Sequence, residues 1–189
     1  MRAKRLVVIG LVATLCTVPA AAALATGSNE PDHTPTLVQQ VRDATRGFQD
    51  VNDATAAGYA SLGSCVSGPT EGAMGIHYGK DALVGDGELH ADQPELLLYE
   101  QRGGERRLLG VEYLVVADAW TAAGNTAPPV LVGQHFQFVN SPNRFGLPAF
   151  YELHVWAWQE NPMGTFADFN PAVSCEEYTG EPEGSHTGH

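Results

Sequence analysis

PELLLYEQRGGERRLLGVEYLVV, residues 94–116, is the stretch that decides the fold of this chain. Two apolar runs, 95–100 and 108–116, are separated by the turn sequence RGGE, and this arrangement is typical of an antiparallel β-hairpin. Two further strand-like runs follow at residues 130–139 and 149–158, with prolines and glycines in the segments between them. These runs predict a curved antiparallel sheet of about four strands.

The segment before the hairpin predicts one amphipathic helix. Between residues 36 and 59, apolar side chains recur at steps of three and four residues, with Thr34 or Thr36 as a candidate N-cap. A helix packed on an antiparallel sheet is an α+β architecture. Residues 63–87 contain seven glycines and little periodicity, so we expect a long loop there.

The N-terminus has the layout of a secretory signal peptide over residues 1–25. Basic residues come first, an apolar run spans residues 6–18, and small residues precede a cleavage site expected before Thr26. The alternative is an uncleaved membrane anchor, although the apolar stretch is short for one. We expect a secreted, extracellular protein whose mature chain begins with a disordered lead-in at residues 26–35.

Composition limits the partners of the chain. It has 189 residues, 22 acidic against 10 basic side chains, and a formal net charge of −12. Nucleic-acid binding needs clustered Lys and Arg, so this class is excluded, as is an anionic membrane surface after signal cleavage. The length fits one domain, which we expect to span residues 36–175. Residues 176–189 are acidic and almost without apolar side chains, and are expected to form a disordered tail.

The chain has three cysteines, of which Cys16 leaves with the signal peptide. The remaining pair, Cys65 and Cys175, predicts a disulfide in an exported protein. It closes a loop of about 110 residues, which the chain-entropy description values at roughly 4–5 kcal/mol. The alternative is a pair of metal-ligating or catalytic thiols, although neither cysteine lies in a CxxC motif.

Five short blocks resemble successive blocks of an uncharacterised family of exported bacterial proteins that is common in actinobacteria. The resemblance covers roughly residues 40–175, and it implies an exported single domain without assigning a catalytic residue. The blocks are GAMGIHY (72–78), PELLLYE (94–100), GVEY (110–113), LHVWAW (153–158) and NPAVSC (170–175).

Histidines on separate predicted elements could form a metal site. His77 lies in the glycine-rich segment, His135 in the third predicted strand and His154 in the fourth, where alternation places Glu152 on the same face. With Glu112 of the second strand, these histidines have the ligand types of a Zn, Cu or Fe site. The spacing is not diagnostic, and each histidine could instead be a packing or surface residue. Separation of His77 and His154 by more than about 10 Å would favour that alternative.

Aromatic side chains suggest a ligand pocket near the same face. Tyr78, Tyr113, Trp156 and Trp158 could line a concave surface for a small apolar molecule or a sugar, or could be core residues of the sheet. The serines lack a GxSxG context, which argues against a serine hydrolase. We therefore expect a secreted domain that binds a small ligand or a transition-metal ion. The alternative is a non-catalytic extracellular interaction or assembly module without metal, and the sequence assigns no reaction.

Overall fold

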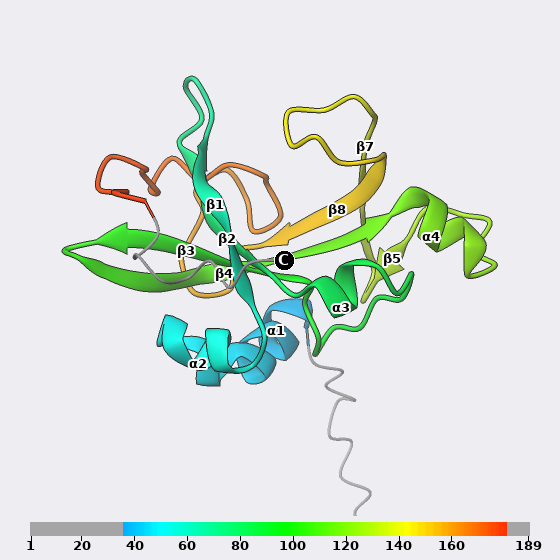
Figure 1. Cartoon of the computed structure of the whole chain (residues 1–189), viewed down its shortest axis with the longest axis horizontal. Coiled ribbons are helices and arrows are strands. Elements are labelled where there is room, and N and C mark those ends of the chain that lie inside the picture. The colour runs from blue at the N-terminus through cyan, green and yellow to red at the C-terminus, as the bar shows by residue number, and fades with distance from the viewer. Residues whose placement is uncertain (1–35, 181–189) are drawn as a thin grey trace, which may run out of the picture. The chain divides into compact units, whose positions relative to one another are not determined.

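The predicted hairpin forms the centre of a curled antiparallel sheet in the computed structural model, which describes residues 36–180 (Figure 1). The sheet has six strands in the order β1-β2-β3-β4-β8-β7, rather than the predicted four. Every neighbouring pair is antiparallel. The strands are β1 (Ala60–Ser67), β2 (Ala73–Gly79), β3 (Leu96–Arg102), β4 (Glu105–Val116), β7 (Gln137–Val139) and β8 (Phe150–Val155).

The predicted helix is divided into three short elements that cover one face of the sheet (Figure 1). Thr36 is the N-cap of the first and forms a capping box with Gln39. Gly47 disfavours a continuous helix, and Asp50 starts the last element by accepting a hydrogen bond from the backbone N–H of Asn52 at 2.9 Å. The elements are α1 (Leu37–Thr45), η1 (Arg46–Phe48) and α2 (Val51–Ala56).

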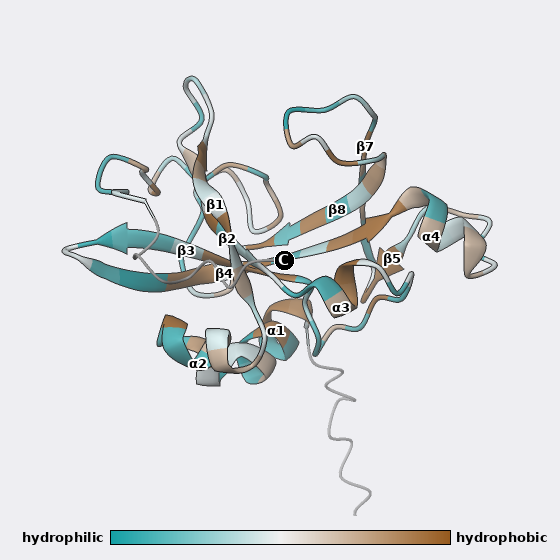
Figure 2. Cartoon of the chain, in the orientation of Figure 1, coloured by the Kyte–Doolittle hydropathy of each residue, from teal (hydrophilic) through white to brown (hydrophobic). Residues whose placement is uncertain are grey.

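The main core lies between these helices and the sheet. Alternate residues of the central strands face α1, among them Leu97, Tyr99 and Val111, all fully buried. Leu37 and Val41 of α1 pack against them. Figure 2 shows apolar stretches along β4 and β8, while the turn end of the β3–β4 hairpin is hydrophilic. The α+β class is therefore confirmed.

The glycine-rich segment 63–87 is not the long loop that the sequence predicts. It contains the end of β1, the whole of β2 and the short helix α3 (Asp81–Val84). Gly75 lies inside β2 with a φ of 96°, and a Cβ atom there would lie 2.5 Å from the backbone oxygen of Tyr99. The glycine therefore permits close contact between two strands rather than a loop.

The predicted third strand, 130–139, is also divided. A turn at Val132 and Gly133, both with positive φ, separates β5 (Val130–Leu131) from β6 (Gln134–His135). These two form their own ribbon, and only β7 joins the main sheet. The helix α4 (Ala117–Ala122) follows β4.

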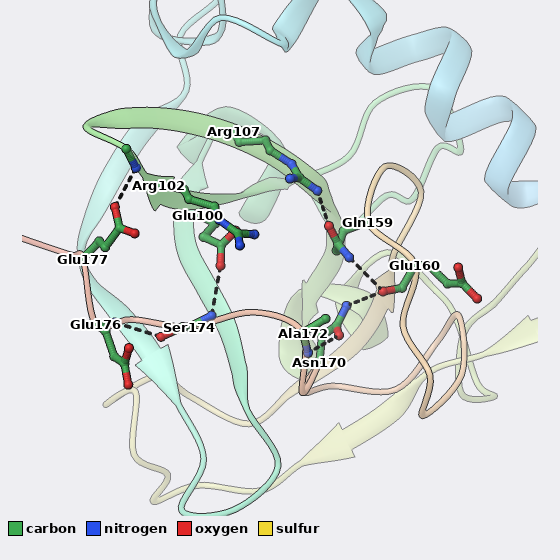
Figure 3. Close-up of polar contacts among 11 residues, drawn as sticks. Glu100, Arg102, Arg107, Gln159, Glu160, Asn170, Ala172, Ser174, Glu176 and Glu177 are labelled. Carbon is green, nitrogen blue, oxygen red and sulfur yellow. Dashed lines mark hydrogen bonds and ion pairs between the residues drawn. The ribbon is translucent and has the colours of Figure 1, made fainter.

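The predicted disulfide between Cys65 and Cys175 is present, with Cα atoms 5.7 Å apart. The chain beyond it continues beside β3 and β4 as far as Gly180, past the predicted domain end at residue 175. Figure 3 shows this segment: the backbone N–H of Ser174 donates to Glu100, and that of Gly103 donates to Glu177 at 2.6 Å. These contacts hold residues 176–180 against the sheet, where the sequence predicts a disordered tail.

The predicted signal peptide, 1–25, and lead-in, 26–35, lie outside the described residues, as does the remainder of the predicted tail, 181–189. Within residues 36–180, no helix is long and apolar enough to cross a membrane.

Candidate metal centre

The candidate site lies on the face of the sheet opposite the helices. On β2, Ile76 and Tyr78 belong to the helix-side core, so His77 between them points the other way. The same alternation turns Glu112 of β4 and His154 of β8 toward this second face, because their neighbours along each strand are in the helix-side core. Three strands thus each supply one side chain.

Strand register brings these side chains together. Glu112 pairs directly with His154 across β4 and β8. His77 lies on β2, with β3 between it and β4, yet its Nε2 is 3.2 Å from Oε2 of Glu112. Gly110 permits the close approach of β4 to the end of β8, since a Cβ there would lie 2.2 Å from the backbone oxygen of Val155. The curl of the sheet therefore brings together one side chain from each of β2, β4 and β8.

The three side chains lie close enough together to hold one metal ion between them. The Nε2 atom of His154 lies 3.8 Å from Oε2 of Glu112, and the two imidazole rings are 6.2 Å apart between centroids. One ligand atom from each residue falls within 4.8 Å of the others. His77, Glu112 and His154 are 7%, 4% and 1% exposed. Two imidazoles and one carboxylate leave further coordination positions for water or a ligand.

His154 is the most unusual member of the group. Both of its ring nitrogens are buried, and neither has a hydrogen-bond partner among the described residues. The Nδ1 atom lies 3.6 Å from Oδ1 of Asp168, which in turn accepts a hydrogen bond from the side-chain amide of Gln137. A buried polar group without a partner lowers the stability of the fold by about 1–3 kcal/mol. The imidazole of His154 would therefore be stabilised by a ligand that bonds to one of its nitrogens.

A third acidic residue, Glu152, forms a carboxyl pair with Glu112. Burial, the charge of Glu112 and the charge of Asp168 raise the pKa of Glu152 to about 9. Burial also acts to raise the pKa of Glu112, but His154, His77 and the hydrogen bond from Glu152 outweigh it and hold that pKa below its ordinary value. Burial lowers the pKa of His154. Within this carboxyl pair, Glu112 is therefore the ionised member at neutral pH and Glu152 the protonated one.

A cavity of about 380 Å³ opens onto this group. His77, Glu112 and Glu152 form its polar wall. Most of the remaining wall is apolar and comes from β1, β2, β3, β4 and the loop between β7 and β8. Its volume is within the range of about 300–1,000 Å³ that small-molecule sites occupy.

Of the four predicted metal ligands, the structure brings together His77, Glu112 and His154 but not His135. His135 is exposed on β6, where it pairs with Val130 outside the main sheet. The prediction placed it on a strand adjacent to β8, and the turn at Val132 and Gly133 removes it from that strand. His135 therefore does not belong to the site.

The predicted aromatic pocket also differs from the structure, and none of its four residues lines the cavity. Tyr78 and Tyr113 are in the helix-side core, where the hydroxyl of Tyr113 donates to the backbone oxygen of Ala91 at 2.6 Å. Trp156 belongs to a second apolar cluster on the other face. Trp158 lies beyond the end of β8 and donates to Thr45, because the strand alternation does not continue past Val155. These four side chains pack the protein.

Sequence reasoning missed the role of two residues. Glu152 was visible on the His154 face by alternation, but nothing in the sequence showed that it would meet Glu112. Asp168 lies in the segment after β8, which has no periodicity that could have pointed to the site.

No protein-family model, curated protein or solved structure matches the chain.

Proposed function

We propose that the protein binds one divalent transition-metal ion through the Nε2 atoms of His77 and His154 and the carboxylate of Glu112. The observation that carries this proposal is the buried imidazole of His154, whose two nitrogens have no hydrogen-bond partner among the described residues. A metal ion on Nε2 gives the first nitrogen a ligand bond. Asp168 then accepts the N–H of the second, which is the usual outer partner of a metal-bound histidine.

Two imidazoles and a carboxylate suit Zn²⁺, Fe²⁺ or Cu²⁺ rather than Mg²⁺ or Ca²⁺, which prefer oxygen ligands. The pKa of Glu112 lies below its ordinary value, so its carboxylate is available as an anionic ligand at neutral pH. His77 and Glu112 line the cavity, so a small molecule or water in it could reach an ion held by these residues.

Export of the protein is part of the proposal. The disulfide is typical of an oxidising compartment, and the resemblance to a family of exported bacterial proteins points the same way. In an oxidising compartment the disulfide of this domain remains formed, so the domain that would hold the ion keeps its covalent cross-link.

Metal analysis of tag-free protein tests the proposal. We expect one equivalent of Zn²⁺ per chain after dialysis, and an absorption band of bound Co²⁺ when that ion is substituted. His77→Ala and Glu112→Gln should each abolish stoichiometric binding. His135→Ala is the matched control, because it removes an exposed histidine outside the site and should leave one equivalent bound.

The proposal fails if the wild-type chain retains no stoichiometric Zn²⁺, Cu²⁺ or Fe²⁺ at micromolar concentrations. It also fails if His135→Ala removes the ion as effectively as His77→Ala. Near-ultraviolet circular dichroism of each variant separates lost ligands from lost folding.

A further inference from the structure

The cavity beside the candidate metal centre has two kinds of wall. Apolar side chains from five strands and from the loop 140–149 cover most of it, while the carboxyl groups and His77 make up a polar part. The apolar members of the strands include Leu62, Val66, Met74, Leu96 and Leu114. This lining suits an apolar molecule better than a sugar, because hydroxyl groups would find few partners along it.

The loop 140–149 forms one side of the cavity, and the side chain of Asn143 makes four hydrogen bonds within it. Asn143 donates to the backbone oxygens of Asn140 and Leu147, at 3.1 and 2.9 Å. Its side-chain oxygen accepts hydrogen bonds from the backbone N–H groups of Phe145 and Leu147. These four bonds fix the part of the loop that carries the cavity-lining residues Arg144, Phe145 and Leu147.

Arg144 is the one basic residue of the described chain that lines this cavity. Its guanidinium lies over the ring of Phe145 and donates one hydrogen bond, to the backbone oxygen of Ser67 on β1 at 3.3 Å. No carboxylate among residues 36–180 lies within 4 Å of it, although acidic residues outnumber basic ones by 22 to 10. A guanidinium has five N–H donors, so most of this fork remains available to a bound group.

We infer that the cavity binds a small, mainly apolar monocarboxylate, with its carboxylate on Arg144 and its apolar body along the strands. A planar guanidinium matches a carboxylate through two parallel hydrogen bonds. Because His77 and Glu112 line the same cavity, a molecule bound there would also be near an ion held by these residues. This last point rests on the proposed metal site, whereas recognition of the carboxylate rests on Arg144 alone.

Octanoate and 1-octanol are the matched probes, because they share an apolar chain and differ in charge. Each is titrated by calorimetry into tag-free protein, once loaded with Zn²⁺ and once treated with EDTA. We expect octanoate to bind and Arg144→Gln to weaken it roughly tenfold or more, the range of a charge-assisted hydrogen bond. 1-Octanol should bind more weakly and respond little to the substitution.

Arg46→Gln is the control variant. It removes the same charge from an exposed arginine of η1 that pairs with Asp43, so octanoate affinity should not change. Arg144→Lys should restore part of the affinity, since it returns the charge without the planar fork. Equal losses in the Arg144→Gln and Arg46→Gln proteins, or equal affinities for the two probes, would overturn the inference.

The two proposals fail in different ways. Octanoate binding that depends on Arg144 in EDTA-treated protein, together with no stoichiometric metal, would support the ligand class and remove the metal centre. Stoichiometric Zn²⁺ with no octanoate binding at millimolar concentration would leave the metal centre and overturn the ligand class.

Discussion

On the face of the sheet that the helices cover, the hydroxyls of Tyr59, Tyr99 and Tyr113 each donate a hydrogen bond to a backbone oxygen, at 2.6 or 2.7 Å. On the opposite face, the ring nitrogens of His154 have no such partner among the described residues. The same strands build both faces, so the difference arises from side-chain choice and not from backbone geometry. It indicates that the first face stabilises the fold, while the unpaired nitrogens on the second are the feature on which the proposed metal site rests.

The largest expected effect is on the free energy of unfolding, when a side chain is removed from the core on the helix-covered face. Leu97→Ala removes a fully buried side chain from its core and should lower the free energy of unfolding by about 2–5 kcal/mol. Urea denaturation followed by circular dichroism measures this. Met163→Ala, at a side chain that is 68% exposed, should change it by less than about 0.5 kcal/mol. A similar loss in both variants would contradict the assignment of the core.

The stability of the fold should depend on pH through Glu95. This carboxyl group is buried and accepts a hydrogen bond from the backbone N–H of Leu114. Burial raises the pKa of Glu95 from 4.5 to about 8 in the folded protein. Its contribution is therefore fully present below about pH 4.5 and is lost as the pH rises through 8, by up to a few kcal/mol.

Glu95→Gln keeps a side-chain oxygen for that hydrogen bond and removes the titration. The difference in unfolding free energy between wild type and Glu95→Gln, measured from pH 4 to 9, should favour the variant increasingly as the pH rises. A difference that does not change with pH would show that Glu95 ionises normally.

On the site face, Asp168 is expected to orient His154 without touching the ion. Asp168→Ala should weaken Zn²⁺ binding by about 10–100-fold while leaving the stoichiometry at one. Competition with a chromophoric chelator measures the affinity. Asp43→Ala removes an exposed carboxylate that pairs with Arg46 and does not belong to the site, so it should leave the Zn²⁺ affinity unchanged. Equal affinity in wild type and Asp168→Ala would mean that Nδ1 of His154 has another partner.

The smallest expected effects have opposite signs on the two faces. In metal-free protein, His154→Leu removes buried nitrogens without partners and should raise the unfolding free energy by about 1 kcal/mol. Tyr99→Phe removes a hydroxyl that is hydrogen-bonded to Phe48 and should lower it by about 1 kcal/mol. Urea denaturation in EDTA measures both. A loss of stability in both variants would show that His154 is well accommodated without a ligand.

The sequence predicted the centre of this fold because its signals there are local. The RGGE turn defined the β3–β4 hairpin, and strand alternation placed Glu112 and His154 on the faces that turn toward the site. His77 was predicted as a ligand from a loop, whereas it lies on β2, because the seven glycines of the segment resemble a loop even where Gly75 permits strand contact.

Other features depend on register and tertiary packing, which local patterns do not contain. The run 130–139 has the composition of one strand, and only the positive φ angles at Val132 and Gly133 divide it and remove His135. Contact between His77 and Glu112 depends on the curl of the sheet across β3. The helix-side positions of Tyr78 and Tyr113 follow from which face meets α1, and an aromatic residue alone does not reveal that.

The disulfide has a consequence for the order in which the protein matures. Cys175 lies in the segment after β8 that carries Asp168, and its bond to Cys65 attaches that segment to β1. A newly made chain with reduced thiols has one fewer attachment for the carboxylate beside His154. Formation of the disulfide therefore adds a covalent constraint on the segment that carries Asp168, and the proposed metal site would have its outer carboxylate fully attached only in the oxidised chain.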